Sequence, residues 1–152
     1  MARAYIERGQ LDEAEPLLKE ALADLTYENY AGVHTNYGLL EFKRGNFATA
    51  QFHFKKALER NRNDCVAHSY LGRCYLEQKN LTLALPQLER AMGICQPMGF
   101  DEPHYYSAIA YYRDGQKEKS RLRFEELIRV FPSGPNSDKA QKMVALIKKE
   151  TP

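Results

Sequence analysis

Small and apolar residues recur along this chain with a period of about 34 residues, which is typical of stacked helical hairpins. When the periods are aligned, one column of equivalent positions holds the small residues Ala14, Ala50, Ala84 and Ser120. One helical turn later, a second column holds the large apolar residues Leu18, Phe54, Leu88 and Phe124. A second small column, further upstream in each period, consists of Ala2, Gly38, Gly72 and Ala108. Apolar residues that share one helical face predict amphipathic helices. The pattern therefore predicts stacked helix–turn–helix repeats with a continuous core.

The register of these columns divides the chain into repeats, which span residues 1–26, 31–64, 65–98 and 101–134. The first repeat begins inside its first helix, so we expect upstream sequence that holds any targeting signal. The extra residues between repeats fall in segments 25–30 and 95–100. We expect these segments to form longer loops, since insertions in solenoids lie in loops on one face.

The residues after the fourth repeat predict one further helix, over residues 136–149. Asn136 or Ser137 is suited to cap its first turn with a side-chain oxygen. The apolar residues of this segment share one face, and its lysines lie on the others; the apolar residues are Ala140, Met143, Val144 and Ile147. We expect this helix to cover the open end of the solenoid.

The charge of the chain is nearly balanced. Its 152 residues include 22 Lys and Arg and 20 Asp and Glu, for a net charge of +2. Basic and acidic residues are interspersed as on solvated helix faces, which argues against a nucleic-acid partner. No apolar run approaches the ~18 residues that a membrane-spanning helix needs.

The columns, together with Tyr5, Tyr75, Tyr111 and the loop residue Pro132, resemble the tetratricopeptide repeat over nearly the whole chain. The resemblance implies an all-α, right-handed superhelical solenoid with a C-terminal capping helix. It also implies a non-catalytic protein that holds a partner peptide or helix in a concave groove lined by the first helix of each repeat. The chain departs from the usual repeat at Glu41, which replaces an aromatic residue, and at the histidines near the repeat starts.

Three shorter runs resemble the type IV pilus pilotins, which are outer-membrane lipoproteins built of the same repeat. The runs are residues 24–27, 35–40 and 54–61. The resemblance implies an outer-membrane secretin or another pilus assembly component as the protein partner. It also implies a place on the periplasmic side of the outer membrane, with membrane contact only through a lipid anchor absent from these residues. The alternative function is a cytoplasmic peptide adaptor or co-chaperone of the same family.

Repeat position predicts which side chains line the groove. The first repeat supplies Arg3 and Ile6, and the later repeats supply Thr35, Leu39, Phe42, Lys43, Val66, Ser69, Arg73, Leu76, Tyr105, Ile109, Tyr112 and Arg113. This apolar and aromatic stripe, edged by positive charge, suits an amphipathic helix or an extended peptide with acidic flanks. The carboxylate clamp of chaperone-binding relatives is not expected, because Val66 and Tyr70 stand where that clamp requires lysine and arginine.

Three histidines, His34, His68 and His104, share one repeat position. Helices of successive repeats lie ~9 Å apart, whereas zinc ligands lie ~2 Å from the ion. We therefore expect these rings to fill semi-buried aromatic positions and to be hydrogen-bonded. His53 has no partner at metal-ligand spacing in the sequence, and we expect no metal and no cofactor.

The three cysteines allow one plausible disulfide. Cys65 and Cys74 lie about 13 Å apart along one predicted helix, which is too far for a bond. Cys65 begins the first helix of the third repeat and Cys95 follows its second, so the hairpin can bring them together. A Cys65–Cys95 disulfide is thus a hypothesis, and it suits an oxidising compartment. Cys74 is expected to be a small apolar core residue.

No catalytic signature is present in the sequence. It has no glycine-rich phosphate loop, no His-Glu-x-x-His and no Gly-x-Ser-x-Gly. We therefore expect a protein that is not an enzyme. A metal- or thiol-dependent enzyme is the third class of function to test, and elemental analysis for a stoichiometric bound metal would decide it.

Overall fold

The computed structural model describes residues 1–24 and 26–152, and the elements within them are helices. Residue 25, where the first expected long loop begins, lies outside the described residues. The helices are α1 (Ala2–Glu7), α2 (Leu11–Ala23), α3 (Tyr30–Lys43), α4 (Phe47–Arg60), α5 (Cys65–Glu77), α6 (Leu81–Cys95), the 3₁₀ helix η1 (Gln96–Met98), α7 (Glu102–Arg113), α8 (Lys117–Val130) and α9 (Ser137–Glu150). The pairs α1–α2, α3–α4, α5–α6 and α7–α8 follow the expected repeats, and α9 follows the expected final helix.

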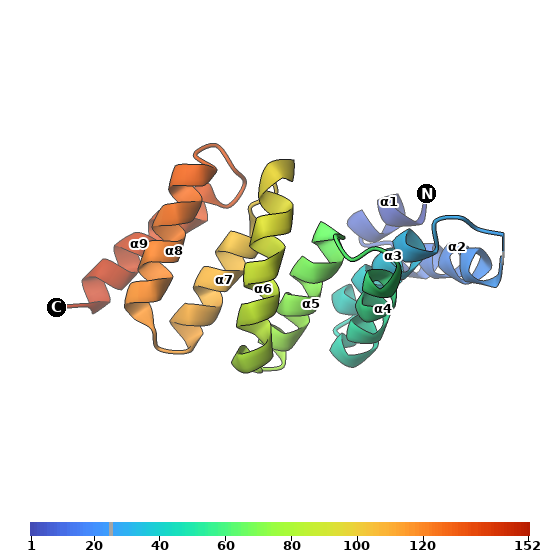
Figure 1. Cartoon of the computed structure of the whole chain (residues 1–152), viewed down its shortest axis with the longest axis horizontal. Helices are drawn as coiled ribbons and strands as arrows, with labels where there is room; N and C mark the ends of the chain where they lie inside the picture. The colour runs from blue at the N-terminus through green and yellow to red at the C-terminus, as the bar shows by residue number, and fades with distance from the viewer. Residues whose placement is uncertain (25) are drawn as a thin grey trace.

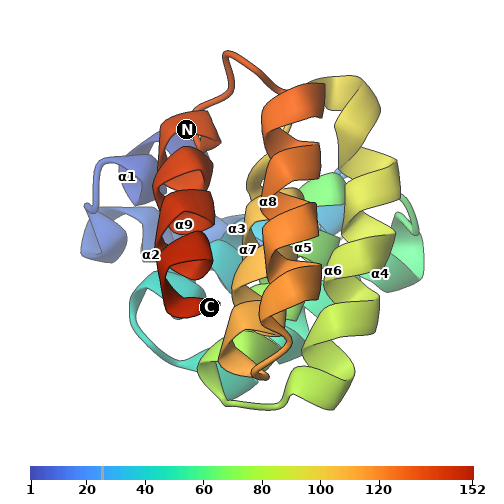
Figure 2. The same cartoon turned by 90° about the vertical axis from the view of Figure 1, so that its left-hand side faces the viewer.

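The helices stack in chain order into an elongated solenoid, with the two termini at opposite ends (Figure 1). The two helices of each repeat pack together, and the second helix also packs on the first helix of the next repeat. The first helices α1, α3, α5 and α7 contact one another in series, and we call them the inner layer. Figure 2, which looks along the stack, shows α8 and α9 nearest the viewer with the earlier repeats behind them.

The small-residue columns exist because helices approach too closely for a larger side chain. A Cβ atom on Gly38 would lie 2.5 Å from the ring of Phe54, and one on Gly72 would lie 2.6 Å from Cγ of Leu88. Both large residues are fully buried. The alternation of small and large residues across facing helices thus forms a close-packed core within each repeat, as the sequence predicts.

A residue with left-handed backbone conformation lies two positions after the last residue of the first helix of each repeat. In three repeats that residue is glycine, with φ of +77° at Gly9, +80° at Gly45 and +76° at Gly115. The third repeat has Lys79 there, with φ of 60°. The backbone N–H of the residue that follows each of these positions donates to the first helix's last turn, at the carbonyls of Tyr5, Glu41, Tyr75 and Tyr111. The same turn therefore occurs in all four repeats, although Lys79 carries its side chain in a left-handed backbone conformation that favours glycine.

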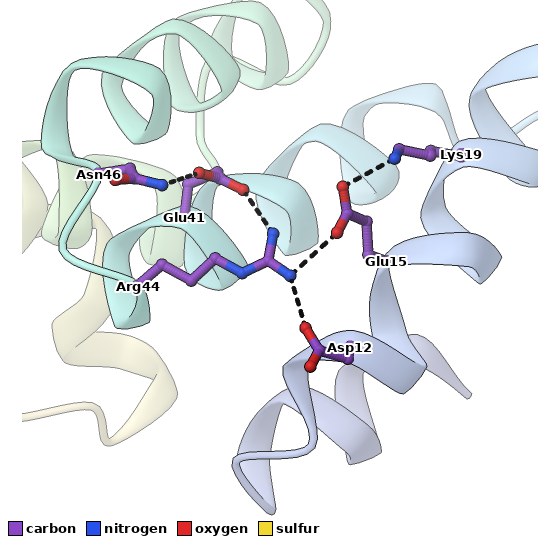
Figure 3. Close-up of polar contacts among 6 residues, drawn as sticks. All are labelled: Asp12, Glu15, Lys19, Glu41, Arg44 and Asn46. Atoms are coloured by element: carbon purple, nitrogen blue, oxygen red, sulfur yellow. Dashed lines mark hydrogen bonds and ion pairs between the residues drawn. The ribbon is translucent and has the colours of Figure 1, made fainter.

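A polar network joins the first two repeats at the position where Glu41 replaces an aromatic residue (Figure 3). The buried Glu41 carboxylate accepts hydrogen bonds from Arg44 Nη1 at 3.2 Å and Asn46 Nδ2 at 2.8 Å. Arg44 also donates to Glu15 of α2 at 2.9 Å and to Asp12 at 3.1 Å. A charge-assisted network thus takes the place of aromatic packing between α2 and α3.

Helix α9 packs on α8 and is anchored to the start of the fourth repeat. The buried carboxylate of Asp101 accepts from the backbone N–H of Asn136 at 2.9 Å and from its side-chain amide at 2.8 Å. Asn136 occupies the N-cap position, but its side chain makes no capping bond to α9, so the expected side-chain cap is wrong there. The amide instead donates to the buried carboxylate of Asp101, which requires hydrogen-bond donors.

Candidate functional site

The predicted groove residues divide into two sets, according to burial. Five of them are buried: Ile6, Thr35, Leu39, Ser69 and Leu76. Thr35 donates from its hydroxyl to Asp64 at 2.6 Å, and the three aliphatic residues lie in the hydrophobic core. Their prediction as groove-lining residues is therefore wrong, because these side chains lie in the packed interior and leave no surface for a partner.

The second set reaches the surface of the inner layer. Arg3, Phe42, Val66, Arg73, Tyr105, Ile109 and Tyr112 are half-buried, and Lys43 and Arg113 are exposed. Tyr112 is partly engaged within the chain, since its hydroxyl donates to both oxygens of the Glu150 carboxylate at 2.9 and 3.0 Å. The surface set therefore keeps the expected character, which is apolar and aromatic with positive charges beside it.

The centre of the inner layer is an arginine surrounded by aromatic rings. The guanidinium carbon of Arg73 lies 4.1 Å from the ring centroid of Tyr106, 4.5 Å from that of Tyr70 and 4.8 Å from that of Phe42. Its Nη1 donates to Oε2 of Glu102 at 3.3 Å. We call these five residues the Arg73 cluster. Its members come from three successive inner-layer helices, α3, α5 and α7.

Two rings of the Arg73 cluster were missed by the sequence prediction. Tyr70 and Tyr106 occupy the same repeat position, and Asn36 is their counterpart in the second repeat. All three stand two residues before the Gly38, Gly72 and Ala108 column, so the register contained a signal for them. The prediction instead used their neighbours Ser69 and Tyr105, one residue earlier, and in the third repeat that neighbour is buried.

Burial reinforces the neutral state of these tyrosines, whose ordinary pKa of about 10 already lies above physiological pH. Desolvation raises the pKa of Tyr70, and the nearby Glu102 raises it further, while Arg73 opposes the shift. Desolvation likewise raises the pKa of Tyr106, again with Arg73 acting in the opposite direction. Both rings are therefore neutral at physiological pH and present their faces to the cation. Each such contact contributes about 0.5–2 kcal/mol, more where water is excluded.

Two further polar pairs extend the stripe toward its ends. In α1, Arg3 donates from Nη1 to the Asn36 side chain at 3.4 Å and from Nε to Glu7 at 2.9 Å. Near α9, the Lys139 ammonium lies 5.9 Å from the ring centroid of Tyr105. Positive side chains therefore accompany the aromatic stripe on both sides of Arg73.

The histidines do not form a metal site within the described residues. His68 is hydrogen-bonded through Nε2 to the Arg62 carbonyl at 2.8 Å, as expected. His104 is fully buried, and neither ring nitrogen has a hydrogen-bond partner among the described residues, so the expectation of a hydrogen-bonded, semi-buried ring is wrong for it. His34 and His53 face each other with their Nδ1 atoms 2.9 Å apart, so His53 does have a close partner. The described part of the chain has no group of three or more His, Cys, Asp or Glu that could hold an ion.

The hypothesised disulfide is present in the structure. Cys65 and Cys95 are bonded, with their Cα atoms 5.2 Å apart, and the bond joins the start of α5 to the end of α6. Cys74 is a buried free thiol, and burial raises its pKa to about 12. It therefore stays protonated and acts as an apolar core residue, not as a nucleophile.

The chain belongs to the tetratricopeptide repeat family. Models of this repeat match residues 1–25, 35–97 and 104–134, which together cover most of the chain. Proteins of this fold are typically non-catalytic interaction scaffolds. No helix of the described residues is both long and apolar enough to cross a lipid bilayer.

Two curated relatives share the repeat at moderate identity. Tetratricopeptide repeat protein 37 of Xenopus laevis is 30% identical over 127 residues, which cover 78% of this chain. Superkiller complex protein 3 of Homo sapiens is 30% identical over 125 residues, which cover 79% of it. The chain spans 8% of the length of each relative.

Solved structures share the fold at lower identity. PilF of Pseudomonas aeruginosa superposes with a TM-score of 0.83 at 16% identity, over 98% of this chain and 65% of PilF. A crystal structure of MamA superposes with a TM-score of 0.80 at 19% identity, over 99% of this chain and 84% of MamA. Both comparisons show an all-helical solenoid of the same kind.

Proposed function

We propose that this chain is a non-catalytic scaffold that binds a peptide or amphipathic helix of a protein partner along its inner layer. The observation that carries the proposal is the aromatic stripe around Arg73, on the inner layer of a tetratricopeptide repeat solenoid. Aromatic and arginine side chains dominate the binding energy of protein interfaces. Here they are contributed by rigid helices, so binding needs little ordering of the site.

A photo-crosslinking experiment tests whether the inner layer is the binding surface. A photoreactive amino acid replaces Lys43, which is exposed on the inner layer, or Phe52, whose side chain is 55% exposed on α4. In cells of the source organism, we expect a specific partner to be crosslinked from position 43 and not from position 52. Crosslinking from position 52 alone would refute the proposed surface.

Alanine variants then measure the contribution of the stripe. Phe42→Ala is expected to weaken partner binding by about 1–3 kcal/mol, as for a buried aromatic at an interface. Phe52→Ala removes an aromatic residue of the same size from the outer surface and is the matched control. Circular dichroism checks that both variants stay folded. Equal affinities for Phe42→Ala and wild type would contradict the proposal.

The more specific proposal is a pilotin-like factor in secretin or type IV pilus assembly, on the periplasmic side of the outer membrane. The resemblance of three sequence runs to pilotins supports it, and so does the likeness in fold to PilF. The Cys65–Cys95 disulfide also supports an oxidising compartment. The test is the amount of assembled secretin in cells that lack this protein. Rescue by wild type and not by Phe42→Ala would support the proposal, and normal assembly in the deletion strain would refute it.

The alternative is a cytoplasmic peptide adaptor or co-chaperone of the same repeat family. Thiol alkylation in intact cells, followed by denaturation and mass spectrometry, separates the two. A protein kept in an oxidising compartment retains the disulfide and exposes only Cys74 on denaturation. Three free thiols would favour the adaptor.

A further inference from the structure

We infer that Arg73 is the docking point for an acidic side chain of the partner, which replaces Glu102 on the guanidinium when the partner binds. This inference rests on the proposed function, because it assumes that a peptide lies along the inner layer. It names the chemistry of the partner at the centre of the groove: an aspartate or glutamate within an otherwise apolar segment.

The guanidinium of Arg73 is held in place before any partner arrives. Rings from three different helices surround it at 4.1, 4.5 and 4.8 Å, and its side chain is 17% exposed. A planar guanidinium stacked on aromatic faces loses less conformational freedom on binding than a free one. Its remaining exposure is enough for a carboxylate to reach it from the groove.

The carboxylate that Arg73 already has is weakly bound. Glu102 accepts a single hydrogen bond, and its 3.3 Å lies beyond the usual range for a charged pair, which is about 2.7–2.9 Å. The Glu102 side chain is 29% exposed, so it can leave without burying an unpaired charge. An arginine can hold a carboxylate through two parallel hydrogen bonds. A partner carboxylate with that geometry would therefore displace Glu102.

The surroundings favour an internal side chain over a chain-terminal carboxylate. Half-buried apolar residues lie on each of the three helices that supply the cluster, with Phe42 on α3, Val66 on α5 and Ile109 on α7. A partner that covers these residues extends beyond Arg73. Val66 and Tyr70 also stand where a clamp for a terminal carboxylate would require lysine and arginine.

Peptide selection on the folded protein tests this inference. A phage-displayed library of random 12-residue segments, fused so that no peptide has a free carboxyl terminus, is selected against wild type and Arg73→Gln in parallel. We expect wild type to enrich peptides with one Asp or Glu between apolar residues, and Arg73→Gln to lose that acidic preference. An unchanged preference on Arg73→Gln, or no acidic preference on wild type, would overturn the inference.

The selected peptide then gives a quantitative test. Arg73→Gln should weaken its binding by on the order of tenfold or more, because a charged hydrogen-bonded pair is lost. Arg129→Gln removes the same charge from an exposed position on α8, outside the inner layer, and should change binding by less than about twofold. Glu102→Gln should tighten binding by about two- to fivefold, since the internal competitor is gone. Weaker binding by Glu102→Gln would show that Glu102 positions Arg73 and would refute the exchange.

The same measurements separate failure of this inference from failure of the proposed function. If the peptides lose affinity with Phe42→Ala but not with Arg73→Gln, the groove is the binding site and Arg73 is not its acid-binding point. If the peptides ignore both changes, or if the library yields no binder, the inner layer is not a peptide groove and both proposals are wrong.

Discussion

Mild acid should destabilise the second repeat through the pair His34 and His53. The two Nδ1 atoms are 2.9 Å apart, and the His53 ring stacks on Tyr37 with 4.4 Å between centroids. One facing nitrogen can donate to the other only if at least one ring is neutral. Burial, and then the charge of His34, lower the pKa of His53 to about 4. Burial also lowers the pKa of His34.

The sign of the effect follows from these depressed pKa values. In the unfolded chain a histidine has a pKa of about 6.5, so the unfolded state binds protons first as the pH falls. The contribution of His53 to stability is complete above about pH 6.5 and is lost between about pH 6.5 and 4. At pH 5 the full shift in the pKa of His53 corresponds to a loss of about 2 kcal/mol in the free energy of unfolding. Because His53 is only half-buried, solvent screening reduces this, and we expect a loss of about 1 kcal/mol.

Urea unfolding at pH 7.5 and pH 5.0, followed by circular dichroism, measures this loss. Between pH 7.5 and pH 5.0, the free energy of unfolding of wild type should fall by about 1 kcal/mol more than that of His53→Gln. Leu83→Gln, which changes an exposed apolar residue on α6, should retain the wild-type pH dependence. An NMR titration should place the pKa of His53 near 4. A pKa near that of free histidine, or equal pH dependence for His53→Gln and wild type, would refute the reasoning.

Four further changes test the fold. Gly72→Ala should lower the free energy of unfolding by about 1–3 kcal/mol through overpacking. Gly93→Ala should raise it by about 0.5–1 kcal/mol in the same denaturation assay, because no neighbour lies within 4 Å of the added Cβ. Lys79→Gly should raise the melting temperature, because it removes the strain of a side chain in the left-handed backbone conformation. After the extra chain entropy of glycine is subtracted, the expected gain in the free energy of unfolding is about 0.5–1 kcal/mol. Reduction of the Cys65–Cys95 bond should lower the free energy of unfolding by roughly 2–4 kcal/mol, and equal urea midpoints with and without reductant would contradict it.

The repeat register predicted the fold because it reports local steric constraints. Gly38 and Gly72 occupy equivalent positions, and each must be small because a large residue on the facing helix approaches it closely. Each repeat imposes the same constraint again, so the signal is present several times in one sequence. The all-helical solenoid and its helix pairs could therefore be expected from the sequence.

The groove was predicted less well because repeat position does not determine how far a side chain projects. Ser69 and Tyr70 are adjacent on α5, but the first is fully buried and the second lines the Arg73 cluster. A shift of one residue rotates a helix position by about 100°, which is enough to move it from surface to core. The His34–His53 contact was missed because the register aligns equivalent positions of different repeats, whereas this contact joins the two helices of one repeat. Its counterpart in the third repeat joins His68 and Gln87.

The Arg73 cluster also makes binding depend on the packing between repeats. Its rings belong to α3, α5 and α7, and no single helix supplies more than one side of the site. Gly72 and the disulfide fix α5 against α6, and α7 packs on α6 in turn, so the position of α7 relative to α5 depends on these contacts. A change such as Gly72→Ala should therefore weaken peptide binding although Gly72 is buried and cannot touch the partner. The affinity of the groove is in this sense a property of the stack and not of any one repeat.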